Sequence, residues 1–125
     1  MANNTKIGIV LQAGTETHEG LARALHALLY TKELVERGRD VRLVFDGAGT
    51  SWLAAIRKQE TDAAKGLGRI FEGLKQAGVT YEVCDYCSGA FHVKEELQDE
   101  PLSGKYMDHP SIGDLVEAGY QIWIL

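Results

Sequence analysis

Two cysteines, Cys84 and Cys87, stand three positions apart and are the only cysteines in the chain. This spacing lets two sulfurs meet, so the pair suits a resolving dithiol, a persulfide carrier or half of a metal site. Cys84 ends a predicted strand. Cys87 falls just before or at the start of the next predicted helix, where free N–H groups favour a thiolate. The alternative is that both are small buried hydrophobic side chains, and we favour a function for at least one.

Two further polar residues fall at predicted strand ends. His18 lies in the loop 12–19 after the first strand, where a histidine can exchange protons near neutral pH. Asp46 directly follows the second strand, a common place for a functional carboxylate. We therefore predict Cys84, Cys87, His18 and Asp46 as the catalytic residues, with His109 as a secondary candidate.

We assign no metal and no cofactor to the chain. A closed zinc site needs four ligands, usually Cys and His, and there is no second cysteine pair beside Cys84 and Cys87. A mixed site completed by histidines, within one subunit or shared between subunits, stays open.

Two loops rich in Gly and Thr support a second hypothesis. The loop 12–19 offers Thr15 or Thr17 as a helix cap, and the loop 46–52 contains two glycines that permit positive φ or close backbone approach. In the simpler interpretation of the second loop, Ser51 is an N-cap and Trp52 a core or subunit contact. The alternative function is a non-catalytic flavodoxin-like module that binds a small phosphorylated ligand or a flavin.

The elements that position these residues follow from the hydrophobic pattern. Short apolar runs predict strands, and apolar residues at three-to-four spacing predict helices. The predicted strands cover 7–11, 41–45, 79–84 and 120–125, and the predicted helices cover 17–37, 51–56, 70–77, 88–97 and a last segment from 112. Residues 59–68 are predicted to be irregular, and 101–107 to be a loop with the option of a short strand. In the last helix we expect Ile112, Leu115 and Val116 to face inward, with Gly119 as its stop.

Strands that alternate with helices predict right-handed crossovers and a parallel sheet covered on both faces. We predict one domain over residues 1–125, an α/β fold built as a three-layer α/β/α sandwich with a mainly parallel sheet of about five strands. In such sheets the site lies beyond the carboxyl ends of the strands, where His18, Asp46 and the cysteines fall.

Composition limits the classes of partner. Thirteen Lys and Arg against eighteen Asp and Glu give a net charge of −5, which disfavours nonspecific nucleic-acid binding. No apolar run approaches the roughly 20 residues of a membrane span, and residues 1–6 lack the pattern of a secretory signal. We expect a cytoplasmic protein with neither nucleic acid nor membrane as a partner.

Several segments resemble the DsrE/DsrF-like family, and the resemblance covers nearly the whole chain. They are the Gly–Thr loop with the long first helix, the VFDGAG segment 44–49, the VCDYC segment 83–87 followed by Phe91, and the closing GYQ at 119–121. The resemblance implies a small α/β domain assembled as a homotrimer or homohexamer. It also implies a carrier cysteine that receives sulfur from a donor protein and passes it to an acceptor protein.

The family's carrier cysteine matches Cys84 by its place after the third strand, and a second cysteine found in many less-studied members matches Cys87. The segment 88–92 departs from the Ala-rich helix with paired arginines in the relay subunits, which marks a side branch. The leading hypothesis is a sulfur-transfer or thiol-redox protein in which His18 or Asp46 tunes protonation. Helix position favours Cys87 as the nucleophile, whereas the resemblance favours Cys84.

A third hypothesis is a purely structural subunit of an oligomer. Trp52, Tyr86, Phe91 and Trp123 would supply its apolar contact surface, although aromatic residues at this density are more often core.

Overall fold

The computed structural model describes residues 5–125. Residues 1–4, on which the expectation about a secretory signal partly rests, lie outside the described residues. Five strands, five helices and one 3-10 turn follow one another along the chain: β1 (Lys6–Leu11), α1 (His18–Glu36), β2 (Asp40–Phe45), α2 (Gly49–Lys58), α3 (Asp62–Gln76), β3 (Thr80–Cys84), α4 (Asp85–Ala90), η1 (Glu95–Leu97), β4 (Leu102–Ser103), α5 (Ile112–Glu117) and β5 (Tyr120–Ile124).

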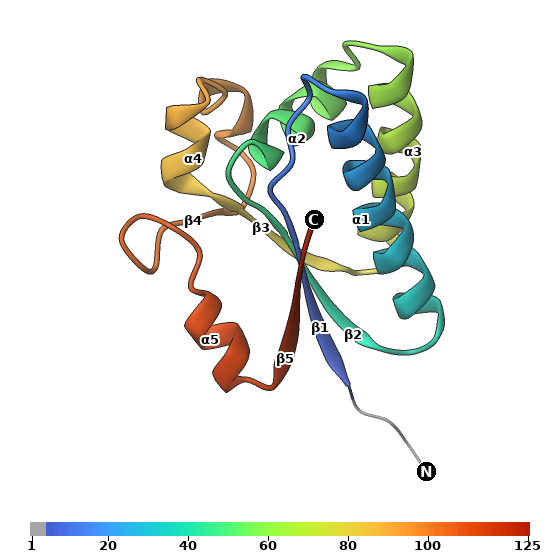
Figure 1. The fold of residues 1–125 in the computed structure, drawn as a ribbon, viewed down its shortest axis with the longest axis vertical. Coiled ribbons are helices and arrows are strands. Elements are labelled where there is room, and N and C mark those ends of the chain that lie inside the picture. The colour runs from blue at the N-terminus through green and yellow to red at the C-terminus, as the bar shows by residue number, and fades with distance from the viewer. Residues whose placement is uncertain (1–4) are drawn as a thin grey trace.

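The strands form one sheet in the order β4-β3-β2-β1-β5, and every neighbouring pair is parallel. Helices cover both faces, with α1, α2 and α3 on one side and α5 on the other (Figure 1). The predicted three-layer α/β/α sandwich is confirmed. Among residues 5–125, every helix falls short of the length or the apolar character that a bilayer crossing requires.

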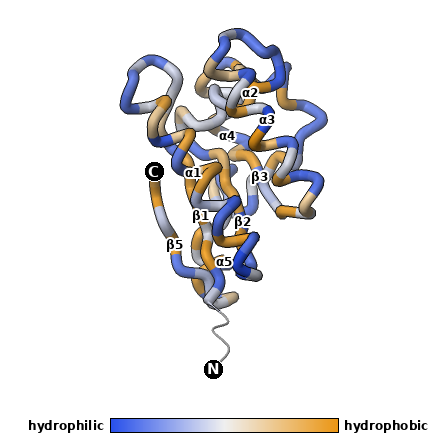
Figure 2. The backbone as a smooth tube through the Cα atoms, turned by 90° about the vertical axis from the view of Figure 1, so that its right-hand side faces the viewer, coloured by the Kyte–Doolittle hydropathy of each residue, from blue (hydrophilic) through white to orange (hydrophobic). Residues whose placement is uncertain are grey.

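Side chains that alternate along the strands fill two cores of unequal size. Ile9 packs with α1, α2 and α3 in the larger core, whereas the next residue, Val10, joins Leu115 of α5 in the smaller one. Figure 2 colours the chain by residue hydropathy, and it shows hydrophobic residues along the central strands and hydrophilic residues at the outer turns. The second helical layer is thin, and this explains one wrong prediction: Leu115 is buried, but Ile112 and Val116 are exposed.

The structure overturns the prediction that residues 59–68 are irregular. Helix α3 begins at Asp62, where the side chain of Thr61 caps the N–H of Ala64 at 3.0 Å. Ala64 and Leu67 are buried and belong to the same apolar face as Phe71 and Leu74. Two glycines in this segment hide the helical periodicity from a sequence pattern.

The predicted helix over 88–97 is also wrong in its bounds. Helix α4 covers Asp85–Ala90 and already contains Cys87, because the side chain of Cys84 acts as its N-cap. The chain then turns at His92, whose φ is +60°, and reaches only the short turn η1 before β4. Cys87 therefore lies in the first turn of the helix, one of the two positions that the sequence predicted for it, and Cys84 is the cap that precedes this turn.

Three strand ends meet at one edge of the sheet. Gln12 follows β1, Asp46 follows β2, and Cys84 ends β3, so neighbouring strands deliver them side by side. Helix α2 begins against this edge at Gly49, where an added Cβ would lie 2.0 Å from the carbonyl oxygen of Leu11. The close backbone approach predicted for the 46–52 loop is thus present. The prediction that Ser51 is the N-cap of the helix is wrong, because Ala48 occupies the N-cap position of α2 and Ser51 lies inside this helix.

Candidate functional site

The two cysteines form a compact, reduced pair at the junction of β3 and α4. Both thiols are free; Cys84 is fully buried, whereas Cys87 is 9% exposed. The backbone N–H of Cys87 donates a hydrogen bond to Cys84 Sγ at 3.3 Å, and the Ser88 hydroxyl donates to the Cys84 carbonyl at 2.7 Å. These contacts fix the first turn of α4, so Cys87 is the sulfur that faces the surface.

Asp46 connects the cysteine pair to the neighbouring strand ends. Its Oδ1 lies 3.9 Å from Cys87 Sγ, a distance at which the thiol donates a weak hydrogen bond to the carboxylate. Its Oδ2 accepts a 2.8 Å hydrogen bond from the side-chain amide of Gln12. Asp46 therefore lies at the cysteines as the sequence analysis expected. Gln12 was missed, because nothing in the residue type or its spacing marks an amide that orients a carboxylate.

His109 approaches the cysteines from a distant part of the chain. One of its ring nitrogens and the sulfurs of Cys84 and Cys87 all lie within 4.8 Å of one another. Its Nδ1 lies 2.6 Å from the carbonyl oxygen of Met107, so in the neutral ring Nδ1 holds the proton and Nε2 keeps a free lone pair. The residue regarded as secondary is thus the histidine closest to the thiols among residues 5–125.

A tight hairpin carries His109. Tyr106 and His109 exchange both backbone hydrogen bonds, and the two residues between them, Met107 and Asp108, have φ of +49° and +66°. Left-handed backbone at two consecutive non-glycine residues is costly and persists only where surrounding contacts hold it. Those contacts come from α4. The Tyr86 N–H donates to the Asp108 carbonyl at 2.9 Å, and the Tyr86 ring lies 4.9 Å from the His109 ring.

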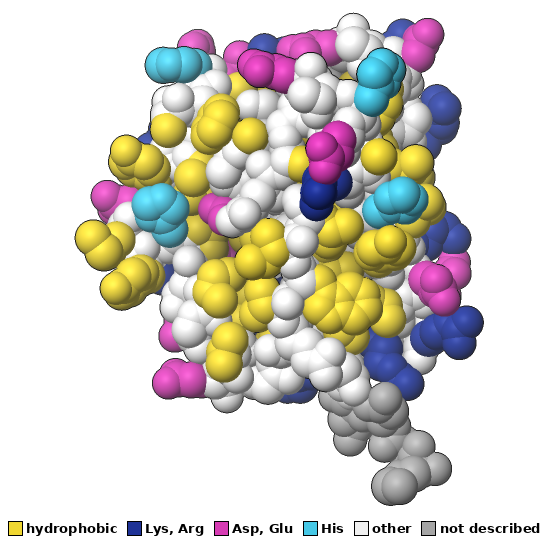
Figure 3. Space-filling model, in the orientation of Figure 1, with side chains coloured by type: hydrophobic (Ala, Val, Ile, Leu, Met, Phe, Trp, Pro, Cys, Tyr) yellow, Lys and Arg dark blue, Asp and Glu magenta, His cyan; other side chains and the backbone are white. Residues whose placement is uncertain are grey.

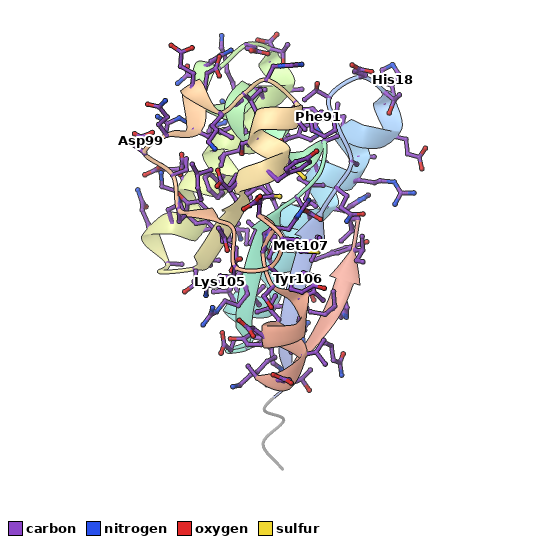
Figure 4. All side chains as sticks on the ribbon, turned by 90° about the vertical axis from the view of Figure 1, so that its left-hand side faces the viewer. His18, Phe91, Asp99, Lys105, Tyr106 and Met107 are labelled. Carbon is purple, nitrogen blue, oxygen red and sulfur yellow. The ribbon has the colours of Figure 1, made fainter. Side chains whose placement is uncertain are left out.

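His18 lies apart from this cluster. It is the exposed first residue of α1, and Figure 4 shows it at the far end of that helix, away from the hairpin that carries Tyr106 and Met107. Its predicted role in tuning protonation has no contact to support it among the described residues. His109 and Asp46 occupy the positions that such a role requires.

Burial controls the chemistry of Cys84. Removal from solvent raises the pKa of its thiol to about 12. The hydrogen bond from the Cys87 N–H lowers this pKa, whereas the nearby Cys87 thiol and the Asp46 carboxylate raise it further. A thiol with such a pKa keeps its proton at neutral pH and is a poor nucleophile until that proton leaves. The geometry therefore separates the pair into a buried protonated thiol and a partly exposed one.

The two Gly/Thr loops meet beside this cluster. The Trp52 indole donates a 2.8 Å hydrogen bond to the Gly14 carbonyl, and Thr17 caps α1 by accepting from the Gly20 N–H at 2.9 Å. The loops line an open pocket of about 260 Å³ together with Phe91. That lining contains Glu16 and no Lys or Arg, a charge balance that disfavours a phosphate group.

Comparison with known proteins places this arrangement in a family. Residues 5–122 match the family model of the DsrE/DsrF-like family. The chain is 28% identical over 99 residues to MJ0733 of Methanocaldococcus jannaschii, an uncharacterized protein; the match covers 78% of this chain and 76% of that relative.

A solved structure supports the fold. The chain is similar to BT1422 from Bacteroides thetaiotaomicron, a conserved protein of unknown function, with a TM-score of 0.61 and 20% identity; the match covers 96% of this chain and 94% of that one. At that identity the likeness concerns the fold alone. The family match runs from the residue before β1 into β5 and includes the Cys84–Cys87 pair, so the chain belongs to the DsrE/DsrF-like family.

Proposed function

We propose that the protein is a cytoplasmic sulfur carrier or thiol-redox protein in which Cys87 accepts a sulfur atom and Cys84 resolves the adduct. The observation that carries this proposal is the unequal thiol pair: two free sulfurs within 4.8 Å, one fully buried and one 9% exposed beside a carboxylate. Membership of the DsrE/DsrF-like family agrees with it.

The first step is a transfer from a persulfide donor. Cys87–SH and a donor R–S–SH give Cys87–S–SH and R–SH, so one sulfur–sulfur bond breaks and another forms with no net oxidation. The Asp46 carboxylate lies where it accepts the Cys87 proton as the attack begins. That proton then leaves with the departing thiol.

The second step has two outcomes that depend on the acceptor. An acceptor thiol that attacks the outer sulfur takes it and restores Cys87–SH. Without an acceptor, Cys84–SH attacks the inner sulfur, and the products are the Cys84–Cys87 disulfide and H₂S. The sulfane sulfur is the oxidant in this step, so no further reagent is needed. The donor and the acceptor are proteins or small thiols that reach the partly exposed Cys87.

We further propose a homo-oligomer, a homotrimer or homohexamer, built on the face that carries the edge strand β5. Figure 3 shows hydrophobic side chains gathered over the middle of the face on which β5, α1 and α5 meet. Exposed large hydrophobic residues of α1 and β5 include Leu29, Tyr30, Trp123 and Ile124, and the Tyr30 ring lies edge-on to the Trp123 ring. An unpaired strand edge next to such a patch is a typical subunit contact. Light scattering of Trp123→Lys against wild type tests it, and a monomeric wild type across a concentration series contradicts it.

Intact-protein mass spectrometry with a small sulfane-sulfur donor tests the carrier proposal. We expect metal-free wild type to gain one sulfur and then to settle as the disulfide, which is two hydrogen atoms lighter than the starting protein. Cys84→Ser should accumulate the persulfide, because the resolving thiol is gone. Cys87→Ser should gain no sulfur.

The two single variants are matched controls for each other, because each keeps one thiol in the same fold. Full sulfur loading in both variants contradicts the proposal. Loading that is lost in Cys84→Ser but kept in Cys87→Ser contradicts the assignment of the acceptor. Circular dichroism of each variant checks that the fold is retained.

A further inference from the structure

Two thiols and an imidazole lie close together at the carboxyl edge of the sheet. The sulfurs of Cys84 and Cys87 and one His109 ring nitrogen lie within 4.8 Å of one another. Zn²⁺ binds sulfur at about 2.3 Å and imidazole nitrogen at about 2.0 Å, so a tetrahedral site spaces these atoms roughly 3.5–3.8 Å apart. Small side-chain rotations close the difference, since His109 stands on a hairpin and Cys87 in the first turn of α4.

One ring nitrogen of His109 is held by a backbone carbonyl, and the other is left to coordinate. Metal-bound histidines donate the N–H of the other ring nitrogen to a carbonyl or carboxylate, which fixes the tautomer. Here Nδ1 lies 2.6 Å from the Met107 carbonyl oxygen, so Nε2 is the nitrogen left for a metal. The Tyr86 ring packs 4.9 Å from the imidazole and limits its rotation.

The cysteine sulfurs also have contacts that suit metal binding. The Cys87 N–H donates to Cys84 Sγ at 3.3 Å, a contact that offsets negative charge on that sulfur. The two cysteines come from one helical turn, whereas His109 comes from a separate hairpin, so a bound ion would cross-link α4 to residues 106–109. Asp46 lies on the Cys87 side, with Oδ1 3.9 Å from its sulfur.

We propose that Cys84, Cys87 and His109 form a Zn²⁺ site with three protein ligands and a fourth position open to solvent. Two thiolates and an imidazole suit zinc better than magnesium or calcium, which prefer oxygen. Zinc binding and sulfur loading are mutually exclusive, because both use the same sulfur lone pairs. The site goes beyond the carrier role and does not depend on it.

Cobalt(II) titration of the reduced, metal-free protein tests the site, because Co²⁺ absorbs strongly in the visible only in a tetrahedral environment. We expect a tetrahedral spectrum that saturates at one ion per chain and is abolished by one equivalent of Zn²⁺. His109→Gln should weaken Zn²⁺ at least about tenfold in competition with a chromophoric chelator. His26→Gln is the matched control, because His26 is exposed on α1 and stacks on Tyr30. The Zn²⁺ affinity of this variant should equal that of wild type.

The absence of a tetrahedral cobalt spectrum overturns the proposal, as does a zinc affinity that His109→Gln leaves unchanged. Circular dichroism shows whether each variant keeps its fold, and Cys87→Ser gives a second loss of binding that does not rely on the hairpin. Sulfur loading of the same metal-free wild type is measured separately, so the zinc site and the carrier role can fail independently. Wild type loaded with Zn²⁺ should resist alkylation at both thiols.

Discussion

The side-chain amide of Gln12 donates a 2.8 Å hydrogen bond to Oδ2 of Asp46. The carboxylate is held at one oxygen by the end of β1 and presents the other oxygen to Cys87 Sγ at 3.9 Å. The ends of two neighbouring strands, β1 and β2, thus act on the Cys87 thiol, and the loss of each contact has a different consequence.

Asp46→Asn keeps the size of the side chain and removes its capacity to accept the Cys87 proton. We expect sulfur uptake at neutral pH to slow by about 10²-fold, a typical contribution of a positioned general base. Gln12→Ala leaves the carboxylate in place but less oriented, and its effect should be smaller. Rapid-mixing mass spectrometry measures both rates. Faster uptake in Asp46→Asn would instead identify the carboxylate as a repulsive charge.

Cys84 should make folding stability fall at alkaline pH. Its folded pKa is raised to about 12 by burial, whereas an unfolded thiol has a pKa of about 8.5. The stabilisation is therefore complete below pH 8.5 and is lost as pH rises toward 12, by at most about 1.4 kcal/mol for each pH unit. Tyr81 and Tyr120 also have raised pKa values, but unfolded tyrosine titrates near 10, so they act mainly above that pH.

Urea unfolding of reduced protein with a chelator, at intervals from pH 8.5 to 10, measures this slope. Cys84→Ala should flatten it, whatever its effect on absolute stability. Equal slopes in wild type and variant would show that the buried thiol does not control the alkaline loss.

Gly49→Ala should destabilise the fold by about 1–3 kcal/mol. The added Cβ would lie 2.0 Å from the carbonyl oxygen of Leu11, so β1 and α2 would have to separate. Gly73→Ala is the control: it is exposed within α3 with no atom within 4 Å of the new Cβ, and it should gain about 0.5–1 kcal/mol. Chemical denaturation of both variants checks the sign of each change.

Thr17→Ala should cost about 1 kcal/mol of unfolding free energy, because it removes the 2.9 Å hydrogen bond that caps α1 at Gly20. Thr15→Ala is the matched variant in the same loop, where the threonine is exposed, and it should change stability by less than about 0.5 kcal/mol. A larger loss from Thr15→Ala would contradict the assignment of Thr17 as the cap.

The strands and the long first helix could be predicted because their signals are local. Apolar runs mark β1, β2 and β3, and the helix predicted over 17–37 is confirmed by α1, which covers His18–Glu36. The start of α3 and the extent of α4 depend on Thr61 and Cys84 as caps. A cysteine is rarely expected in that role, and glycines within α3 weaken its periodic pattern.

The candidate site also contains residues that the sequence could place and residues that it could not. Cys84, Cys87 and Asp46 end or follow neighbouring strands, so the topology of a parallel sheet predicts that they meet. His109 reaches them through a hairpin with two left-handed residues, and His18 faces solvent from the start of α1. The position of His109 is not visible in residue types, because it depends on contacts between segments far apart in sequence.

The pairing of β1 with β5 has a consequence for folding kinetics. Lys6 is in register with Tyr120, so a strand at one end of the described chain must wait for a strand at the other. Closing so long a loop is entropically costly and slow compared with forming α1 or α3. On the ribosome, β1 would remain an open edge until β5 emerges, and the nascent chain would be most prone to aggregation during that interval.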